Sequence, residues 1–260
     1  MEKITSRDNE AVKYAVRLAA SAAQREADGL FFAEGPKLIA ELAKSCTLRA
    51  LYLTEAALAR QGALNAWPDR TVLVSEPVAQ KLAGVQTPQG AFALFETPRP
   101  DADALLAGAA RILALENVQD PGNVGTLLRS AAAFGFDAVL LSRGCASPFA
   151  PKTLRASMGA AGRVPVLAVE ELPAALARLR ARGVTCLAAA LCHSEPLHSV
   201  QGPFAKGLCL VIGSEGQGLR ADTVAACDRA VRIPMTDRVE SLNAGVAGSV
   251  LLWHFRGVED

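Results

Sequence analysis

Ile233-Pro-Met-Thr-Asp-Arg-Val-Glu-Ser-Leu-Asn-Ala-Gly-Val-Ala-Gly-Ser-Val-Leu-Leu-Trp253 is the stretch near the C-terminus that decides the fold. A short apolar strand at 231–233 is expected to stop at Pro234, which has no N–H for a sheet hydrogen bond. After a polar loop, the small and apolar residues of 244–253 predict a buried helix, with Ser241 at its N-cap and Asn243 inside its first turn. The small residues let another backbone come very close, although the stretch alone is equally compatible with ordinary packing.

The composition predicts a globular protein with an aliphatic core. The chain has 260 residues, which is enough for one large or two ordinary domains. Its 27 Lys and Arg residues against 26 Asp and Glu residues give no global charge, so a nucleic-acid partner must be met by a local patch. The six cysteines form no Cys-x-x-Cys pair and the three histidines have no metal-ligand spacing with them. We therefore expect reduced core cysteines and no metal site.

The N-terminus mixes charges and lacks the apolar core of a signal peptide. No apolar run approaches the length of a membrane span. We expect a soluble, cytoplasmic protein with no membrane partner.

Residues 1–96 predict a small α/β domain. Apolar residues recur at helical spacing over 9–24, and Pro36 suits the first turn of a second helix. The other expected elements are strands at 48–53, 71–74 and 90–95 and a helix at 76–83. Two prolines followed by acidic residues at 97–103 break any periodic element, and we take 97–110 as a linker.

From residue 111 onward, short apolar runs alternate with helical stretches. This alternation predicts an α/β domain over 111–260 whose parallel sheet is covered by helices on both faces. Ligands in such sheets bind at the carboxyl ends of the strands, which brings together the loops 116–123, 213–219 and 234–243. The expected strands are 111–115, 138–142, 164–168, 184–188 and 207–212, and the expected helices are 122–134 and 170–182.

Two of these loops carry groups suited to chemistry. In the first, Asn123 can cap the following helix, and Arg129 is expected on roughly the same side of that helix. An arginine in such a place is as often a surface ion pair. The second loop, Gly213-Ser-Glu-Gly-Gln-Gly218, is not the dinucleotide-binding fingerprint and taken alone is an ordinary glycine turn with an exposed Glu215.

A basic stretch lies between these loops in the sequence. Residues 138–169 contain no Asp or Glu. Such unopposed positive charges are typical of a phosphate-binding surface in a nearly neutral protein, although a solvated face has the same composition. The candidate RNA-binding residues are Arg143, Lys152, Arg155 and Arg163.

Taken together, the motifs closely resemble the SpoU (TrmH-like) RNA ribose 2′-O-methyltransferases of the SPOUT superfamily. The resemblance rests on the order and spacing of three segments within 111–256, and the segment 31–41 resembles the start of the small substrate-binding domain of many members. The three segments are Asp120-Pro-Gly-Asn-Val-Gly-Thr-Leu-Leu-Arg129, Ile212-Gly-Ser-Glu-Gly-Gln-Gly-Leu219, and Ile233-Pro-Met235 with Ser241-Leu-Asn-Ala-Gly-Val-Ala247.

The resemblance implies a deep trefoil knot in the C-terminal domain, S-adenosylmethionine bound within it, and a homodimer. The N-terminal domain would bind the RNA substrate, and no metal is required. By position, the methyl donor would contact Gly213, Ile233 and Leu242, with Ala189, Ile212 and Met235 as neighbours.

The implied activity is methyl transfer to a ribose 2′-hydroxyl in structured RNA. A guanidinium is a poor general base because it stays protonated, so we expect Arg129 to hold a phosphate and stabilise alkoxide charge. Asn123, Glu215, Ser241 and Asn243 would position the loops and the ribose, and Asn123 and Glu215 have a purely structural role as the alternative.

The extra N-terminal domain favours ribosomal RNA as the substrate. The alternatives are a tRNA 2′-O-methyltransferase and a non-catalytic RNA-binding protein that keeps the knot. An unrelated nucleotide-binding α/β enzyme is disfavoured, because neither a Rossmann fingerprint nor a P-loop is present.

Overall fold

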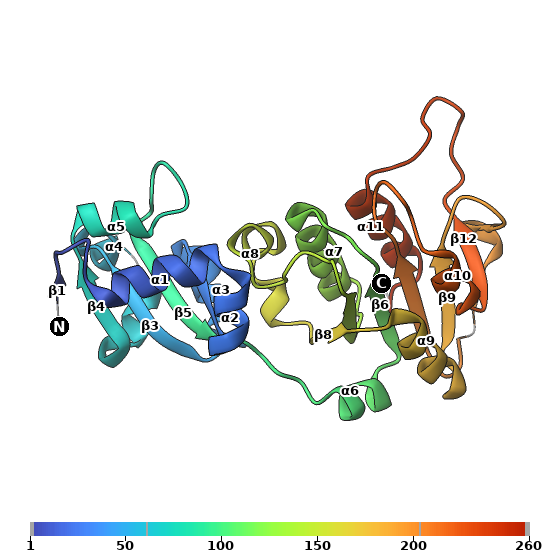
Figure 1. Ribbon diagram of the computed structural model, residues 1–260, viewed down its shortest axis with the longest axis horizontal. Coiled ribbons are helices and arrows are strands. Elements are labelled where there is room, and N and C mark those ends of the chain that lie inside the picture. The colour runs from blue at the N-terminus through green and yellow to red at the C-terminus, as the bar shows by residue number, and fades with distance from the viewer. Residues whose placement is uncertain (1–2, 61, 203, 258–260) are drawn as a thin grey trace. The chain divides into compact units, whose positions relative to one another are not determined.

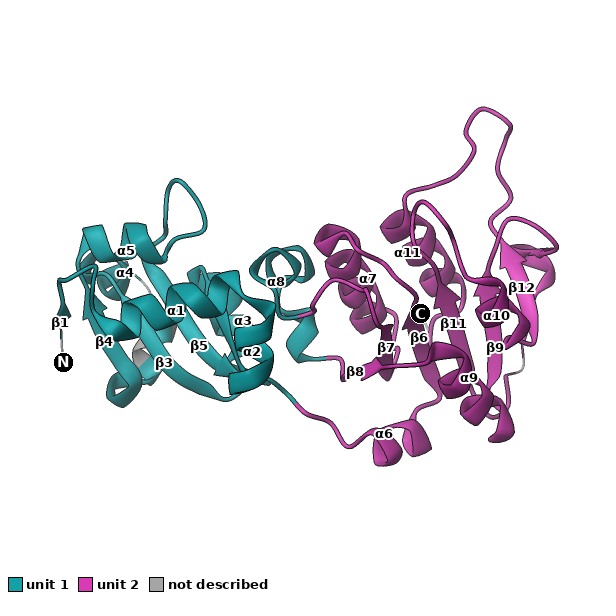
Figure 2. Ribbon diagram, viewed as in Figure 1, with its two compact units in different colours: residues 1–98, 149–163 teal, residues 99–148, 164–260 magenta. Residues whose placement is uncertain are grey.

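The computed structural model describes residues 3–60, 62–202 and 204–257, and the chain forms two compact units (Figures 1 and 2). Unit 1 comprises Met1–Pro98 and Phe149–Arg163, and unit 2 comprises Arg99–Pro148 and Val164–Asp260. This division differs from the predicted one, which left 149–163 in the C-terminal domain. Residues 1–2 and 258–260, the ends of the predicted domains, lie outside the described residues.

Unit 1 is built on a mixed five-stranded sheet with the order β1-β4-β3-β5-β2. Strands β1, β4 and β3 run parallel, and β5 is antiparallel to both β3 and β2. The strands are β1 (Lys3–Ile4), β2 (Leu30–Glu34), β3 (Leu48–Leu53), β4 (Thr71–Val74) and β5 (Ala91–Glu96); the helices are α1 (Glu10–Ala20), α2 (Ala22–Asp28), α3 (Pro36–Leu42), α4 (Glu55–Arg60), α5 (Glu76–Leu82) and α8 (Pro151–Ser157), with 3-10 turns η1 (Gly62–Ala66), η2 (Pro68–Arg70) and η3 (Ala160–Gly162).

The single helix predicted over 9–24 is two helices in the structure. Ser21 ends α1 in an extended conformation, and its side chain caps α2 by accepting a hydrogen bond from the N–H of Gln24 at 3.1 Å. A serine that bonds the backbone in this way competes with continuation of the helix. The apolar face of α1 still packs as predicted, because Val12, Ala15 and Leu18 are fully buried.

The segment 149–163 joins unit 1 through specific contacts. The ring of Phe149 lies 4.8 Å from that of Phe31 in the core, and Arg163 forms an ion pair with Glu41 of α3. Gly159 has a positive φ of +83°, and a side chain there would meet Glu41. These partners are far from the segment in sequence, so composition alone could not assign it to unit 1.

Unit 2 contains a seven-stranded sheet with the order β10-β12-β9-β11-β6-β7-β8, and every neighbouring pair is parallel. The predicted α/β domain with a parallel sheet is thereby confirmed. Its strands are β6 (Arg111–Leu115), β7 (Ala138–Ser142), β8 (Val166–Val169), β9 (Thr185–Ala189), β10 (Glu195–Pro196), β11 (Leu208–Ile212) and β12 (Arg229–Arg232); its helices are α6 (Ala102–Gly108), α7 (Pro121–Ala133), α9 (Leu172–Ala181), α10 (Ala221–Ala225) and α11 (Ala244–His254), with the 3-10 turn η4 (Leu197–Ser199).

Part of the predicted linker is helical. Asp101 caps α6 by accepting hydrogen bonds from the N–H groups of Asp103 and Ala104. Leu106 of α6 packs into the core under the sheet. The acidic residues taken as a break in periodicity are instead an N-cap and the first turn of a helix, where carboxylates are favourable.

Helices cover both faces of the unit 2 sheet (Figure 1). Leu106 of α6 and Leu176 of α9 pack with Ile112 and Leu140 on one face. Helices α7 and α11 contact each other, and α11 also contacts β11, on the opposite face. Strands buried on both faces carry apolar residues at every position, which explains the continuous apolar runs of the sequence. In the described part of the chain, no helix is long and apolar enough to cross a membrane.

Helix α11 lies very close to α7. A side chain at Gly248 would come within 2.2 Å of Leu127 and 2.6 Å of Ile212, and one at Gly245 would meet the amide oxygen of Asn123 at 3.0 Å. The hydroxyl groups of Ser130 and Ser249 are hydrogen-bonded at 2.8 Å across the same contact. The expectation that the small residues of this helix admit a close neighbour is confirmed.

The predicted cap of α11 is wrong. Asn243, not Ser241, is the N-cap, and its side-chain oxygen accepts a hydrogen bond from the N–H of Val246 at 3.2 Å. Ser241 lies in the preceding loop, outside the helix. Both residue types are good caps, so the sequence offered two compatible starts, and the start at Ala244 is the one that sets Gly245 and Gly248 against α7.

Gly248→Ala should destabilise the protein by about 1–3 kcal/mol, because the added methyl group overpacks a fully buried contact. Gly108→Ala is the matched control: Gly108 is also helical, and nothing lies within 4 Å of its added carbon. The control should be neutral or slightly stabilising. Urea-induced unfolding followed by circular dichroism measures both, and equal stabilities of the two variants would contradict the close approach.

Candidate active site

Three loops meet at the carboxyl edge of the unit 2 sheet, as the sequence predicts. They follow β6, β11 and β12. The amide group of Asn123 joins the first two, since it donates a hydrogen bond to the carboxylate of Glu215. The third loop reaches the same place, because the side-chain oxygens of Asn123 and Asn243 both lie beside Gly245.

Asn123 is not the helix cap that we predicted. Asp120 caps α7 by accepting a hydrogen bond from the N–H of Asn123 at 2.9 Å, and Pro121 occupies the first helical position, where its missing N–H costs nothing. The Asn123 side chain is therefore available for Glu215, and it is only 9% exposed. A buried amide that bonds a carboxylate holds the loop after β11 onto α7.

The loop after β11 is closed on itself. Ser214 and Gly218 exchange two backbone hydrogen bonds of 3.2 and 3.0 Å. A side chain at Gly213 would lie within 2.2–2.5 Å of the backbone of Gly218 and Leu219, so only glycine fits there. This contact is the physical reason for glycine at the first position of the loop.

Glu116 is a site residue that sequence reasoning missed. Its carboxylate is only 3% exposed, accepts the backbone N–H of Arg220 at 2.8 Å and the hydroxyl of Thr223, and lies 3.2 Å from the Arg220 guanidinium. It therefore ties the end of β6 to the start of α10. The sequence signal for Glu116 is a carboxylate directly after the apolar run 112–115, because a charge that follows a buried strand is itself buried and needs partners.

Arg129 faces solvent on the third turn of α7, whereas Asn123 is buried. The two side chains are not on the same side of the helix, contrary to our expectation: six residues correspond to about 240° of helical rotation. Within the described residues, the guanidinium of Arg129 has no hydrogen-bond or ion-pair partner. Among the described residues, Arg129 therefore does not form the surface ion pair that was the alternative.

The predicted donor-binding residues fall into two groups. Ala189 and Ile212 end the neighbouring strands β9 and β11, Gly213 follows Ile212, and Ile233 follows β12. These four lie along one part of the carboxyl edge. Met235, Ser241 and Leu242 lie instead on the exposed loop between β12 and α11, which projects from the end of the sheet in Figure 1.

The four basic residues are not an unopposed patch. Arg143 lies 4.0 Å from the carboxylate of Glu170, and Arg163 pairs with Glu41. Arg143 belongs to unit 2, whereas Lys152, Arg155 and Arg163 belong to unit 1. The acidic partners lie outside the stretch 138–169, so counting charges along it could not reveal them.

Several buried or half-buried thiols are poor nucleophiles. Burial raises the pKa of Cys46 and of Cys145, and it raises the pKa of Cys227 to about 12. The nucleophilic form of cysteine is the thiolate, which these groups do not form at neutral pH. Cys46, Cys186 and Cys209 are buried, as expected of core cysteines, whereas Cys192 is exposed, contrary to that expectation.

A parallel α/β domain with helices on both faces is of the doubly wound class, in which ligands bind at the carboxyl edge of the sheet. Here that edge carries the buried carboxylate of Glu116, the buried amide of Asn123 and a closed glycine loop. The particular family follows from comparison. Residues 110–253 match the SpoU rRNA Methylase family, and the chain belongs to that family. Residues 9–93 match the MRM3-like substrate binding domain.

Two relatives of this chain are named as 23S rRNA methyltransferases. The chain is 35% identical over 185 residues to the 23S rRNA (guanosine(2553)-2′-O)-methyltransferase RlmP of Bacillus subtilis, covering 71% of this chain and 72% of that protein. It is 41% identical over 146 residues to the 23S rRNA (guanosine-2′-O-)-methyltransferase RlmB of Xanthomonas campestris, covering 56% of this chain and 58% of that protein.

Two solved structures match this chain over almost its whole length. An rRNA methyltransferase from Sinorhizobium meliloti, crystallised with AdoMet, superposes with a TM-score of 0.85 at 26% identity and covers 97% of this chain and 96% of that one. A putative TrmH-family RNA methyltransferase from Porphyromonas gingivalis gives 0.80 at 32% identity, covering 94% and 96%.

The hydrogen bond from Asn123 to Glu215 can be tested by substitutions that reverse which side chain donates and which accepts. Asn123→Asp should destabilise the protein by about 1–3 kcal/mol, because a buried carboxylate at position 123 would then face the carboxylate of Glu215 in a partly buried contact. Adding Glu215→Gln should recover most of that loss, since the glutamine amide can donate to Asp. Unfolding in urea measures the free energies. A double variant as unstable as Asn123→Asp would show that this bond does not hold the loop.

Proposed function

We propose that this chain transfers the methyl group of S-adenosylmethionine to the 2′-hydroxyl of a ribose in ribosomal RNA. The observation that carries the proposal is the SpoU family match over 110–253, which contains all three loops of the carboxyl edge. The relatives named above act on 23S rRNA, which favours ribosomal RNA over tRNA. Action on ribosomal RNA also agrees with the expected cytoplasmic location.

The methyl donor fits the edge formed by β12, β9 and β11. Ala189, Ile212, Gly213 and Ile233 would contact it there. The loop above this edge carries three apolar side chains with much exposed surface: Met235 and Leu242 are each 36% exposed, and Val239 is 53% exposed. Exposed apolar side chains on one loop are expected where a ligand covers them.

When bound, S-adenosylmethionine supplies an electrophilic methyl group on a positively charged sulfur. Arg129 is the residue best suited to the RNA, because its guanidinium has no partner among the described residues and a guanidinium can bind phosphate oxygens bidentately. We assign to it a hold on the phosphate beside the ribose and stabilisation of negative charge at the 2′-oxygen. Ser241 and Asn243 would position the ribose, whereas the mutual bond of Asn123 and Glu215 gives these two a supporting role.

The RNA would contact both units. Residues 9–93 match a substrate-binding domain, which supports RNA binding by the predicted domain 1–96. Lys152 and Arg155 on α8 add positive charge within unit 1, and Arg143 and Arg163 can exchange their carboxylate partners for phosphate.

We also assign to this chain the trefoil knot and the homodimer of its family. The close approach of α11 to α7 through Gly245 and Gly248 suits a chain that passes through a narrow loop. For the dimer, α11 exposes Val246, Val250 and Trp253 by 50%, 37% and 55% along one face. A helix that is apolar all round is normally buried, so a second copy of the chain would cover this face.

Arg129→Ala should lower methyl transfer by about 10²–10³-fold or more, the usual cost of removing one donor to developing negative charge. The assay incubates labelled S-adenosylmethionine with unmodified 23S rRNA transcript and locates the methylated nucleotide. Affinity for S-adenosylmethionine should not change. Arg178→Ala is the control, since Arg178 is another exposed arginine of unit 2, paired with Asp103 at 2.6 Å. Full activity of Arg129→Ala would remove Arg129 from the mechanism.

Trp253→Glu should weaken self-association by about 30-fold or more, because a charge is then placed in an apolar contact of the hot-spot kind. Analytical ultracentrifugation across a concentration series measures the dissociation constant. Val85→Glu, at a 39% exposed apolar residue of unit 1, should leave the dimer intact. A Trp253→Glu variant that dimerises like the wild type would show that this face is not the interface.

A further inference from the structure

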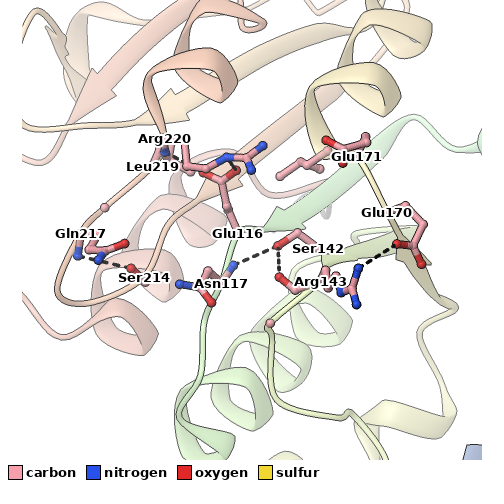
Figure 3. Close-up of a pocket in the computed structure, with 13 residues that line it drawn as sticks. Glu116, Asn117, Ser142, Arg143, Glu170, Glu171, Ser214, Gln217, Leu219 and Arg220 are labelled. Atoms are coloured by element: carbon pink, nitrogen blue, oxygen red, sulfur yellow. Dashed lines mark hydrogen bonds and ion pairs between the residues drawn. The ribbon is translucent and has the colours of Figure 1, made fainter.

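A cavity of about 590 Å³ lies at the carboxyl ends of β11, β6, β7 and β8, within unit 2 (Figure 3). The cavity borders the edge of β12, β9 and β11 to which we assign the methyl donor, called the donor edge below. It is distinct from that edge, because Ala189, Ile233 and the loop 234–243 do not line it. The two places share one wall: Gly213 belongs to the donor edge, and Ser214 and Gln217–Arg220 of the same loop line the cavity. Its volume is in the range of small-molecule sites.

The charges of the cavity are largely balanced. The Arg220 guanidinium lies 3.2 Å from the carboxylates of both Glu116 and Asp222, and Arg143 lies 4.0 Å from Glu170. Both arginines that line the cavity therefore already face carboxylates. A phosphate that entered the cavity would have to displace one of these carboxylates, so the lining favours a neutral group with hydrogen-bonding edges.

The wall after β6 is fixed in an uncommon conformation. Asn117 has a positive φ of 52°, held by the hydrogen bond from its N–H to the hydroxyl of Ser142 at 3.0 Å. Its side-chain oxygen accepts from Gln119 at 3.1 Å, and a side chain at Gly144 would fall 2.5 Å from that oxygen. Non-glycine residues held at positive φ occur preferentially at functional sites.

One carboxylate of the lining is unengaged. Glu171 stands directly before α9 and makes no side-chain cap bond. In the described part of the chain, its carboxylate has no hydrogen-bond or ion-pair partner. Figure 3 shows Glu171 among the residues that line the cavity, together with Arg220, Asn117 and Gln217. The cavity thus offers an acceptor with two oxygens to whatever enters it.

We propose that this cavity holds the guanine base of the nucleotide that is methylated, with Glu171 accepting its N1–H and N2–H groups. The inference rests on the proposed function. Guanine is the standard base with two adjacent N–H donors on its pairing edge, and these match the two oxygens of a carboxylate. A base held here places its ribose toward the shared loop 213–219 and hence toward the donor edge. Glu171 is then a specificity residue.

Inosine tests this contact because it differs from guanosine only by lacking the N2 amino group. The substrate is unmodified 23S rRNA transcript, with guanosine or inosine ligated in at the methylated position once that position is mapped. The wild type should prefer guanosine by about tenfold in kcat/KM, in line with the discrimination of one bidentate contact. Glu171→Gln should lose that preference and keep wild-type affinity for S-adenosylmethionine. Glu170→Gln, the adjacent carboxylate that faces Arg143, should keep the preference.

The other outcomes of this experiment either overturn the guanine-binding inference or count against the proposed function. Equal methylation of guanosine and inosine by the wild type, or a preference retained by Glu171→Gln, overturns the inference and leaves the proposed function standing. Weaker S-adenosylmethionine binding by Glu171→Gln assigns the cavity to the donor and also overturns it. A methylated nucleotide other than guanosine does the same. No methyl transfer by the wild type to any RNA is the separate failure of the proposed function.

Discussion

The contact between α7 and α11 is the constraint on which the site depends. Two helices approach this closely only where one of them lacks side chains, and Gly245 and Gly248 provide that surface. The contact sets Asn123 beside Asn243 and thereby joins the loop after β12 to the start of α7. The hydrogen bond from Asn123 to Glu215 then adds the loop after β11. A small change in this helix contact would shift all three loops together, because packed interiors transmit strain.

This dependence separates supporting residues from reacting ones. Asn123, Glu215 and Glu116 are engaged with other parts of the chain, so their first role is to hold loops in place. Arg129 and Glu171 are exposed and have no partner among the described residues. Engaged polar groups gain little from a ligand, whereas free ones can bind it without first breaking a bond. We therefore assign Arg129 to the reacting nucleotide and Glu171 to its base, whereas the engaged residues of the site first hold the loops.

Two exposed apolar surfaces of unit 2 differ in the kind of partner that suits them. Val246, Val250 and Trp253 form one such surface on α11, and Met235, Val239 and Leu242 form another on the loop after β12. The first is a rigid helical face and suits a second protein copy. The second lies on an extended loop beside the donor edge and suits a small ligand. Both follow from the cost of leaving large apolar side chains in water.

The sequence by itself determined the α/β class and the strands β6 and β7 to the residue, because strands buried on both faces must be continuously apolar. It also located the three loops, since parallel strands end at one edge. Tertiary structure alone decided which polar residue caps α7 and α11, that Phe149–Arg163 packs in unit 1, and that Arg163 faces Glu41. Local sequence preferences for these positions are nearly equal, so the contacts with residues distant in the chain decide which conformation and which partner each residue takes.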